Sequence, residues 1–293
     1  MTQQLLDLSG KIDEFTVELF QAIQNVAGSI GTPFFVVGAT ARDMILKHGY
    51  GIEAIRATND IDLGVEVGSL DQYARLKEAL IKTGMFEPTV EFQRLRYQRV
   101  LSLDVIPFGK FTGPGRSFLW PPENEIEMNT LGFEESFQHS LIVMLKQNPE
   151  LLIRFAHPAG LALLKLISWD DHPERNKDAK DLKLLMRNHI SAGNDIRFFE
   201  KEADIVDILT EKGGFDFERA GARLLGRDIS GIARSETRDR LLKILQRETE
   251  ERGKFRLVLD MADIPSEVST QFEENIALLE EFKAGILEGP AFR

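Results

Sequence analysis

The apolar positions in the first half of the chain switch between helical and strand spacing. Between residues 12 and 26 they recur every three or four positions, which predicts a helix with one buried face. The wholly apolar run Phe34–Val37 then predicts a buried strand, and Gly38 follows it directly. Residues 38–40 form the turn, and residues 41–46 have the composition of the first turns of a helix. The predicted order is therefore strand, tight turn and helix start, whose free N–H groups favour anions.

A second predicted strand carries two acidic residues. Apolar and other residues alternate over positions 60–67, so Asp60 and Asp62 project from one face while Ile61 and Leu63 project from the other. A helix should follow, beginning at the capping box formed by Ser69 and Gln72 and ending near Gly84. Further strands are predicted at residues 94–97 and 100–107. The apolar runs at 140–145 and 151–155 indicate late strands of the same sheet, with helices as the alternative.

The remaining patterns divide the chain into two predicted domains. Residues 109–122 hold three glycines and three prolines, which indicates an irregular surface loop that could act as a lid. Helical periodicity dominates after Pro158. We therefore expect an α+β fold in which residues 1–157 form a mixed sheet with helices and residues 158–293 form a helical domain.

Composition narrows the class of protein. The 293-residue chain has no cysteine, which excludes disulfides, thiolate zinc sites and cysteine nucleophiles. Its formal charge of −11 opposes non-specific binding of nucleic acid over most of the surface. No run of about 18 apolar residues and no signal-peptide pattern occurs, so we expect a cytoplasmic protein without a membrane span.

Three aspartates are candidate metal ligands. Asp60 and Asp62 on one strand face repel each other unless a cation lies between them, and their hard oxygen atoms suit Mg²⁺. Asp104 interrupts the apolar strand predicted at residues 100–107 and would supply a third carboxylate. Phosphoryl transfer with two metal ions needs such a cluster. The alternative is that these aspartates are ordinary solvated residues at strand ends.

The turn at Gly38 would complement this cluster. Its backbone N–H groups and the Thr40 hydroxyl could bind phosphates next to the metal. The alternative is an ordinary strand-to-helix turn, which is common.

These motifs together resemble a known superfamily. The turn Gly38–Asp43, the segment Thr58–Asp62 and then Asp104 are similar to the nucleotidyltransferase superfamily that contains polymerase β, CCA-adding enzymes and the AbiEii/AbiGii type IV toxins. The G-x-x-x-R-D turn is similar to CCA-adding enzymes. Lys165 and the later segment Arg175–Leu182 resemble the toxins instead, whose helical part carries a lysine followed by a basic residue and K-D-x-x-D-L. The combination favours the AbiEii-like group.

The resemblance implies roles for particular residues. Two Mg²⁺ ions would be held by Asp60, Asp62 and Asp104, with Asp104 also able to accept a proton. Lys165 would neutralise phosphate charge. The nucleoside triphosphate would be bound by the turn and by two later aspartates: Gly38, Ala39, Thr40, Arg42, Asp178 and Asp181. Other readings of the helical part are a lysine that reaches solvent and a solvated helix face.

The implied activity is transfer of a nucleoside monophosphate from an NTP to a hydroxyl group. The acceptor would be an RNA such as tRNA, or a protein, and the enzyme could be the toxin of a type IV toxin-antitoxin system with a cognate antitoxin. One alternative is a tRNA-tailing enzyme like the CCA-adding enzymes. Another is a catalytically silent binding protein, favoured by Ala39, because the family turn has glycine or serine there. Residues 219–247 carry eight Lys/Arg against three Asp/Glu. That stretch could contact RNA or be ordinary helix surface.

Overall fold

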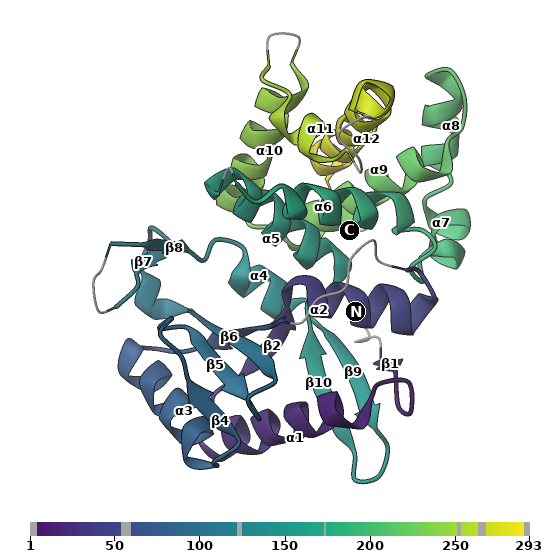
Figure 1. Cartoon of the computed structure of the whole chain (residues 1–293). Helices are drawn as coiled ribbons and strands as arrows, with labels where there is room; N and C mark the ends of the chain where they lie inside the picture. The colour runs from purple at the N-terminus through teal and green to yellow at the C-terminus, as the bar shows by residue number, and fades with distance from the viewer. Residues whose placement is uncertain are drawn as a thin grey trace. The chain divides into compact units, whose positions relative to one another are not determined.

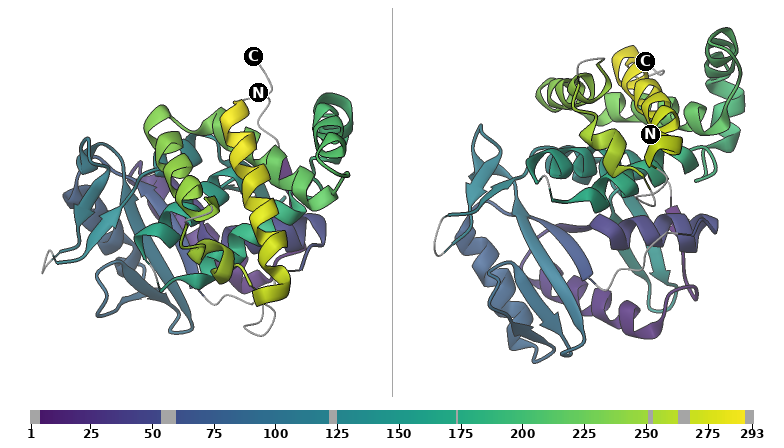
Figure 2. Two further views of the ribbon diagram at one scale, coloured as in Figure 1. Left: turned by 90° about the horizontal axis from the view of Figure 1, so that it is seen from above. Right: turned by 45° about the horizontal axis from the view of Figure 1, so that its top comes forward.

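The computed structural model divides the chain into two compact units (Figures 1 and 2). Residues 1–157, the strand unit, and residues 158–293, the helical unit, each have their own core. The residues described are 5–53, 60–121, 125–172, 174–250, 253–262 and 268–289. No helix among them is long and apolar enough to cross a membrane. The fold class is the expected one, a mixed sheet with helices followed by a helical part.

Over the described residues, the strand unit is built on a mixed eight-stranded sheet. Its spatial order is β1-β9-β10-β2-β3-β6-β5-β4. The strands are β1 (Leu5–Asp7), β2 (Phe34–Val37), β3 (Asp60–Glu66), β4 (Phe86–Pro88), β5 (Arg94–Tyr97), β6 (Leu101–Phe108), β9 (Leu141–Lys146) and β10 (Leu151–Phe155). At the centre, β3 runs antiparallel to β2 and parallel to β6. All strands predicted from the periodicity are therefore present.

Around the sheet, the described residues form four α-helical segments. They are α1 (Glu14–Ser29), α2 (Gly38–Asp43) with its π-helical extension Met44–Gly49, α3 (Leu70–Lys82) and α4 (Phe133–Gln138). α1 and α3 lie side by side (Figure 1). The cap of α3 forms partly as predicted. The Ser69 side chain accepts from the Gln72 N–H at 3.2 Å, but the Gln72 side chain accepts from the N–H of Gly68 rather than of Ser69.

The predicted irregular loop contains regular structure. Lys110–Thr112 is a short 3₁₀ turn, and β7 (Ser117–Leu119) pairs antiparallel with β8 (Glu127–Asn129). The hairpin is supported by stacked rings, with Phe118 and Trp120 in edge contact at 4.6 Å between centroids. The expectation of an entirely irregular segment was wrong because its glycines and Pro114 lie before β7 and Pro121 lies after it, which leaves Ser117–Leu119 to pair as a strand. Pro122, its last predicted residue, lies outside the described residues.

The helical unit packs its two longest helices at very short range. α9 (Phe217–Ile232) and α12 (Val268–Glu288) meet through glycines: a Cβ on Gly226 would lie 2.3 Å from the Phe282 carbonyl oxygen, and one on Gly285 would lie 2.0 Å from that of Arg223. The other helices are α5 (Pro158–Asp171), α6 (Asn176–Asn188), α7 (Asp195–Lys201), α8 (Asp204–Glu211), α10 (Ser235–Thr249) and α11 (Arg256–Asp260).

Candidate active site

One face of β3 carries the acidic residues singled out in the sequence. Asp60 is exposed and Asp62 is half-buried, whereas Ile61 and Leu63 on the opposite face are buried in the core. The next position on the acidic face is Gly64, where a Cβ would lie 2.2 Å from the Phe35 ring. The ring therefore fills the place of a side chain there. The two carboxylates consequently lie at one end of the face, which the Phe35 ring borders.

The turn after β2 lies directly against the Asp62 carboxylate. Val37 is the cross-strand partner of Asp62, and Gly38 follows with φ +69°, in the left-handed region that favours glycine. A Cβ on Gly38 would lie 2.0 Å from Asp62 Oδ2. The position therefore needs glycine for two reasons, its backbone conformation and this close approach. The juxtaposition of turn and carboxylate follows from the antiparallel register of β2 and β3.

The other residues predicted in this turn face the protein rather than solvent. The Thr40 hydroxyl donates to the main-chain oxygen of Asp60 at 2.7 Å, which ties α2 to the start of β3. Ala39 is buried. Arg42 is only 1% exposed and forms an ion pair with Asp43 at 2.6 Å. Thr40 thus positions Asp60, and the nucleotide contacts of Ala39, Thr40 and Arg42 stay predictions.

Asp104 lies on β6, beside Asp62, and is held by an arginine. The parallel register pairs Asp62 with Asp104, and the antiparallel register pairs Asp104 with Arg94 on β5. Arg94 donates from Nε to Asp104 Oδ1 at 2.7 Å and from Nη2 to Oδ2 at 2.8 Å. This bidentate contact, followed by the charges of Asp104 and Asp60, raises the pKa of Arg94. Arg94 belongs to none of the motifs in the sequence that pointed to this site.

The metal-binding capacity of this face follows from that contact. Asp60 and Asp62 supply hard oxygen donors that suit a divalent cation. Asp104 can join them only by sharing its carboxylate with Arg94. In the described part of the chain, no group of three or more His, Cys, Asp or Glu side chains is arranged to hold a metal ion. The donor chemistry is that of a hard divalent cation site, and one of the three carboxylates, that of Asp104, is engaged by an arginine.

The later motif forms a separate, buried cluster inside the helical unit. Lys165 on α5 contacts Asp178 Oδ1 and Asp181 Oδ2 on α6, both at 2.7 Å from its Nζ. Arg175 Nε lies 2.8 Å from Asp178 Oδ2, which also accepts from the Ser168 hydroxyl at 3.1 Å. Lys165, Asp178 and Asp181, which the sequence motif grouped, are therefore in contact in the structure.

The electrostatics of this cluster keep the Asp178 carboxylate ionised. Burial would raise the pKa of Asp178, but Lys165 and Arg175 outweigh burial and hold the pKa below its ordinary value of 3.8. The formal charges of Lys165, Arg175, Asp178 and Asp181 sum to zero. A neutral, hydrogen-bonded set of this kind is what allows charges to be buried between α5 and α6.

The family assignment rests on a match over residues 21–247, to the family described as the nucleotidyl transferase AbiEii toxin of type IV toxin-antitoxin systems. The match covers the carboxylate face and the buried cluster. The chain belongs to this AbiEii family. The resemblance inferred from the sequence is thereby confirmed, and the AbiEii family is one of nucleotidyltransferases.

Several solved structures are similar to this AbiEii chain. They include ANT(2")-Ia in complex with adenylyl-2"-tobramycin, at 17% identity, TM-score 0.39, and coverage of 62% of this chain and 92% of that one. An antigenic nucleotidyltransferase-like protein from Paracoccidioides brasiliensis has 14% identity, TM-score 0.38, and coverage of 69% and 94%. The Thermotoga maritima CCA-adding enzyme complexed with tRNA has 12% identity, TM-score 0.26, and coverage of 96% and 83%. These TM-scores are too low to assign a substrate. A search of curated proteins found no match.

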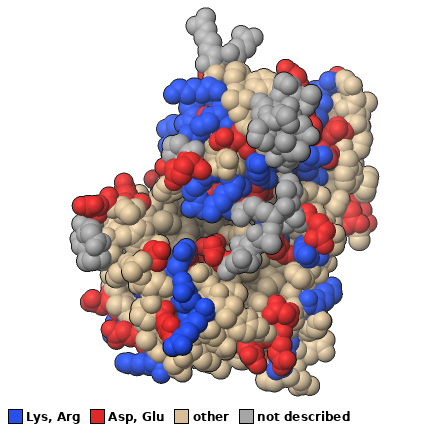
Figure 3. Space-filling view, viewed as in Figure 1, with Lys and Arg blue, Asp and Glu red and all other residues tan. Residues whose placement is uncertain are grey.

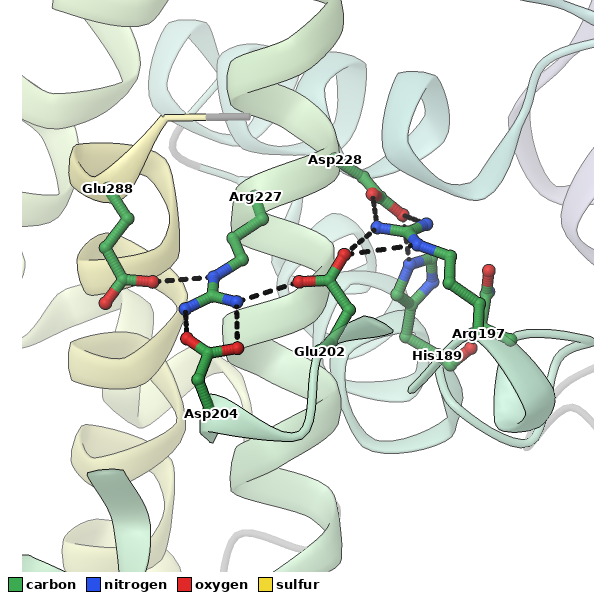
Figure 4. A network of polar contacts seen from close by, with 8 residues as sticks. His189, Arg197, Glu202, Asp204, Arg227, Asp228 and Glu288 are labelled. Carbon is green, nitrogen blue, oxygen red and sulfur yellow. Dashed lines mark hydrogen bonds and ion pairs between the residues drawn. The ribbon is translucent and has the colours of Figure 1, made fainter. Parts of the chain in front are cut away.

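Most arginines in the basic stretch of the AbiEii chain, residues 219–247, form ion pairs within the helical unit. Arg223 and Arg227 on α9 are buried and contact Glu288 on α12. Arg227 also contacts Glu202 at 2.8 Å and Asp204 at 2.5 Å (Figure 4). Further pairs join the stretch to acids elsewhere: Arg219 and Arg223 to Glu281, and Arg240 and Arg247 to Asp170. These arginines therefore stabilise helix packing, and an RNA-binding role for the stretch loses its main support.

Two residues of the sequence motif cannot be placed. Thr58 and Asn59, which precede Asp60, lie outside the described residues. Arg94 could have been suspected, because the strand Arg94–Tyr97 alternates arginine with apolar residues and so presents Arg94 and Arg96 on one face.

Proposed function

We propose that this protein transfers a nucleoside monophosphate from an NTP to a hydroxyl group of an RNA, such as tRNA, or of a protein. The observation that carries the proposal is the register of β2, β3 and β6. It places Asp60, Asp62 and Asp104 on one sheet face with the Gly38 turn against Asp62. Membership of a nucleotidyl transferase family supports the same reaction class.

The residues take distinct roles in the proposed reaction. Asp60 and Asp62 would hold Mg²⁺, which when bound supplies positive charge to the phosphoryl oxygens. The Gly38 turn would bind the triphosphate through backbone N–H groups. Asp104 would accept the proton of the acceptor hydroxyl as its oxygen attacks the α-phosphorus. The α-phosphorus–oxygen bond to the β-phosphate then breaks, and pyrophosphate leaves with the electron pair.

The role of the buried helical cluster is narrower. Lys165 is held between Asp178 and Asp181, so it would have to leave one of them to neutralise a phosphate. The contacts support a positioning role between α5 and α6. Participation of Lys165, Asp178 and Asp181 in nucleotide binding is the further proposal that the family motif suggests.

The test uses the purified full chain with α-labelled NTPs, Mg²⁺ and total cellular RNA and protein. We expect label to enter a product in wild type and to be absent with Asp60→Asn or Asp62→Asn. Glu66→Gln is the matched control, because Glu66 is exposed on the same face of β3. This variant should label its product as wild type does. Equal labelling by wild type and Asp62→Asn would contradict the proposal.

The product separates the acceptor classes and the rival functions. Ribonuclease-sensitive label identifies RNA, and protease-sensitive label identifies protein. Sequencing of a labelled tRNA would show CCA if the protein acts as a CCA-adding enzyme. A silent binding protein would give no label and, by calorimetry, no Mg²⁺-dependent NTP affinity.

A toxin role requires a further experiment in cells. If the protein is the toxin of a type IV system, expression of wild type should arrest growth, whereas Asp62→Asn should be tolerated. Relief of the arrest by one adjacent gene product would identify the antitoxin.

A further inference from the structure

The acidic face of β3 continues into basic residues across the sheet. The strand registers place Asp62, Asp104 and Arg94 in one row across β3, β6 and β5. The neighbouring row contains Asp60, Ser102 and Arg96 in the same order. Figure 3 shows Lys and Arg side chains gathered in a stripe over the strand unit, in the region of β5, beside Asp and Glu. The arginines of β5 therefore lie along one border of the carboxylates.

The contact between Arg94 and Asp104 engages both carboxylate oxygens. The two hydrogen bonds, 2.7 and 2.8 Å long, form the fork geometry in which a guanidinium group matches a carboxylate. The Arg94 and Asp104 side chains are 30% and 17% exposed, so the pair is accessible and yet shielded enough to be ordered. A cation that binds between Asp62 and Asp104 must compete with this guanidinium group for the same oxygen atoms.

Arg94 also has another acidic residue within reach. Its Nη1 lies 3.9 Å from Glu91 Oε1, on the segment before β5. Glu91 is 44% exposed and precedes β5 in the chain. If Asp104 turns towards a metal ion, Arg94 can keep an acidic partner. The exchange therefore does not leave a guanidinium group without a counter-charge.

We propose that Arg94 is a positioning residue that holds Asp104 in the metal-free protein and competes with a divalent cation for it. The inference rests on the proposed function, since it takes the β3 face as the metal site. It adds a residue that the sequence motif does not contain. Asp60 and Asp62 bind the first cation, and Asp104 becomes available only when Arg94 releases it.

Calorimetric titration with Mn²⁺ alone tests this competition without any activity measurement. We expect Arg94→Gln to bind Mn²⁺ about tenfold more tightly than wild type, the effect of removing roughly one charge-assisted contact. Arg94→Lys, which keeps a charge but loses the fork, should fall between the two. The matched control is Arg99→Gln. The Arg99 side chain is 80% exposed and pairs with Glu87 at 2.8 Å. Its loss should not change the affinity for Mn²⁺.

A double-mutant cycle excludes a merely structural role. Asp104→Asn alone should change the Mn²⁺ affinity by less than about twofold, because Arg94 already occupies that carboxylate. In the Arg94→Gln background the same change should abolish the tenfold gain. An additive cycle, or an Arg94→Gln variant with unchanged or weaker Mn²⁺ affinity, overturns the inference.

The titrations also separate this inference from the proposed function. If Asp62→Asn abolishes Mn²⁺ binding while Arg94→Gln has no effect, the metal site stands and the competition is refuted. If Asp62→Asn binds Mn²⁺ as wild type does, or if neither wild type nor Arg94→Gln binds it, the metal site and the competition are both refuted. Binding by Arg94→Gln where wild type binds none supports the competition.

Discussion

In the strand unit, acidic side chains lie on an accessible sheet face, whereas in the helical unit acidic and basic side chains are buried against each other. Asp60 is exposed and Asp62 half-buried. In contrast, Glu202, which is fully buried, contacts both Arg197 and Arg227, and Arg227 also contacts Asp204 and Glu288 (Figure 4). One arrangement leaves carboxylates open to a ligand, and the other uses charge to hold helices together.

The two regions differ in how easily their charged side chains can exchange partners, and a catalytic site needs side chains that can. A buried charge costs several kcal/mol unless partners compensate it, so a buried network has to be nearly complete and cannot easily give up a member. Accessible carboxylates close together need a counter-charge as well, but solvent lets that charge be exchanged. Substitutions in the two regions should therefore separate activity from stability.

The largest effect is expected from Asp62→Asn. Nucleotide transfer should fall by about a thousandfold or more, because the amide is a poor ligand for the cation that supports phosphoryl transfer. The free energy of unfolding should change by less than about 1 kcal/mol, since repulsion from Asp60 is relieved. Parallel transfer assays and urea unfolding measure both. A variant that loses stability and activity together would make Asp62 a structural residue.

Arg227→Met tests the helical unit in the opposite sense. Removing the arginine leaves Glu202, Asp204 and Glu288 short of a partner, and we expect a loss of about 3–5 kcal/mol in the free energy of unfolding. Urea unfolding followed by circular dichroism measures the loss. The matched control is Lys243→Met on the exposed face of α10, which should stay within about 0.5 kcal/mol. Equal effects of the two variants would show that the network contributes nothing.

Gly38→Ala probes the contact between turn and carboxylate. Alanine at φ +69° is strained, and its Cβ would meet Asp62 Oδ2, so we expect a loss of about 1–3 kcal/mol and a strong loss of transfer. Gly10→Ala is the control, because Gly10 has φ +74° with nothing within 4 Å of its Cβ position. It shares the backbone strain without the clash. Identical behaviour of both variants in transfer would remove the argument for the close approach.

The buried network should also give the helical unit an acid-sensitive stability. Burial would raise the pKa of Asp228, but His189 and Arg197 outweigh it and hold the pKa below the ordinary value of 3.8. A lowered folded-state pKa means that the stabilisation is complete above pH 3.8 and is lost as the pH falls towards the folded-state pKa. Urea unfolding at pH about 6 and about 3 should show this loss in wild type and less of it in Asp228→Asn. A pH-independent difference between the two proteins contradicts the assignment.

The smallest effect is expected from the exposed pair of Arg99 and Glu87. These side chains are 80% and 48% exposed, and such ion pairs contribute about 0–1 kcal/mol. Arg99→Gln should therefore change the free energy of unfolding by less than about 0.5 kcal/mol at physiological salt. A loss as large as that of Arg227→Met would refute the distinction between accessible and buried charge.

The acidic face could be predicted from sequence because it depends on local alternation. Asp60 and Asp62 share a face in any strand, and the apolar run Phe34–Val37 followed by Gly38 marks the strand and turn beside it. The contact between Arg94 and Asp104 depends instead on the register of a hairpin. The hairpin turn has Gln98 and Arg99 at φ 45° and 62°. Such turns usually carry Asn-Gly or another glycine pair, so the sequence does not predict this turn.

The buried arginines could not be predicted for a different reason. Helical spacing shows that Arg223 and Arg227 share a face of α9, but not what that face meets. Their partner Glu288 lies 65 and 61 residues away in sequence. The close packing that joins α9 to α12 depends on Gly226 and Gly285. The arginines of α9 were therefore interpreted as surface residues, although Arg223 and Arg227 are buried.

A crystal structure with Mn²⁺ and a non-hydrolysable NTP would test whether the acidic face of β3 is the active site, because anomalous scattering locates the metal. We predict a metal ion about 2.0–2.3 Å from carboxylate oxygens of both Asp60 and Asp62, with the triphosphate at the Gly38 turn. A bound nucleotide whose metal contacts neither aspartate would contradict the claim that this face is the active site.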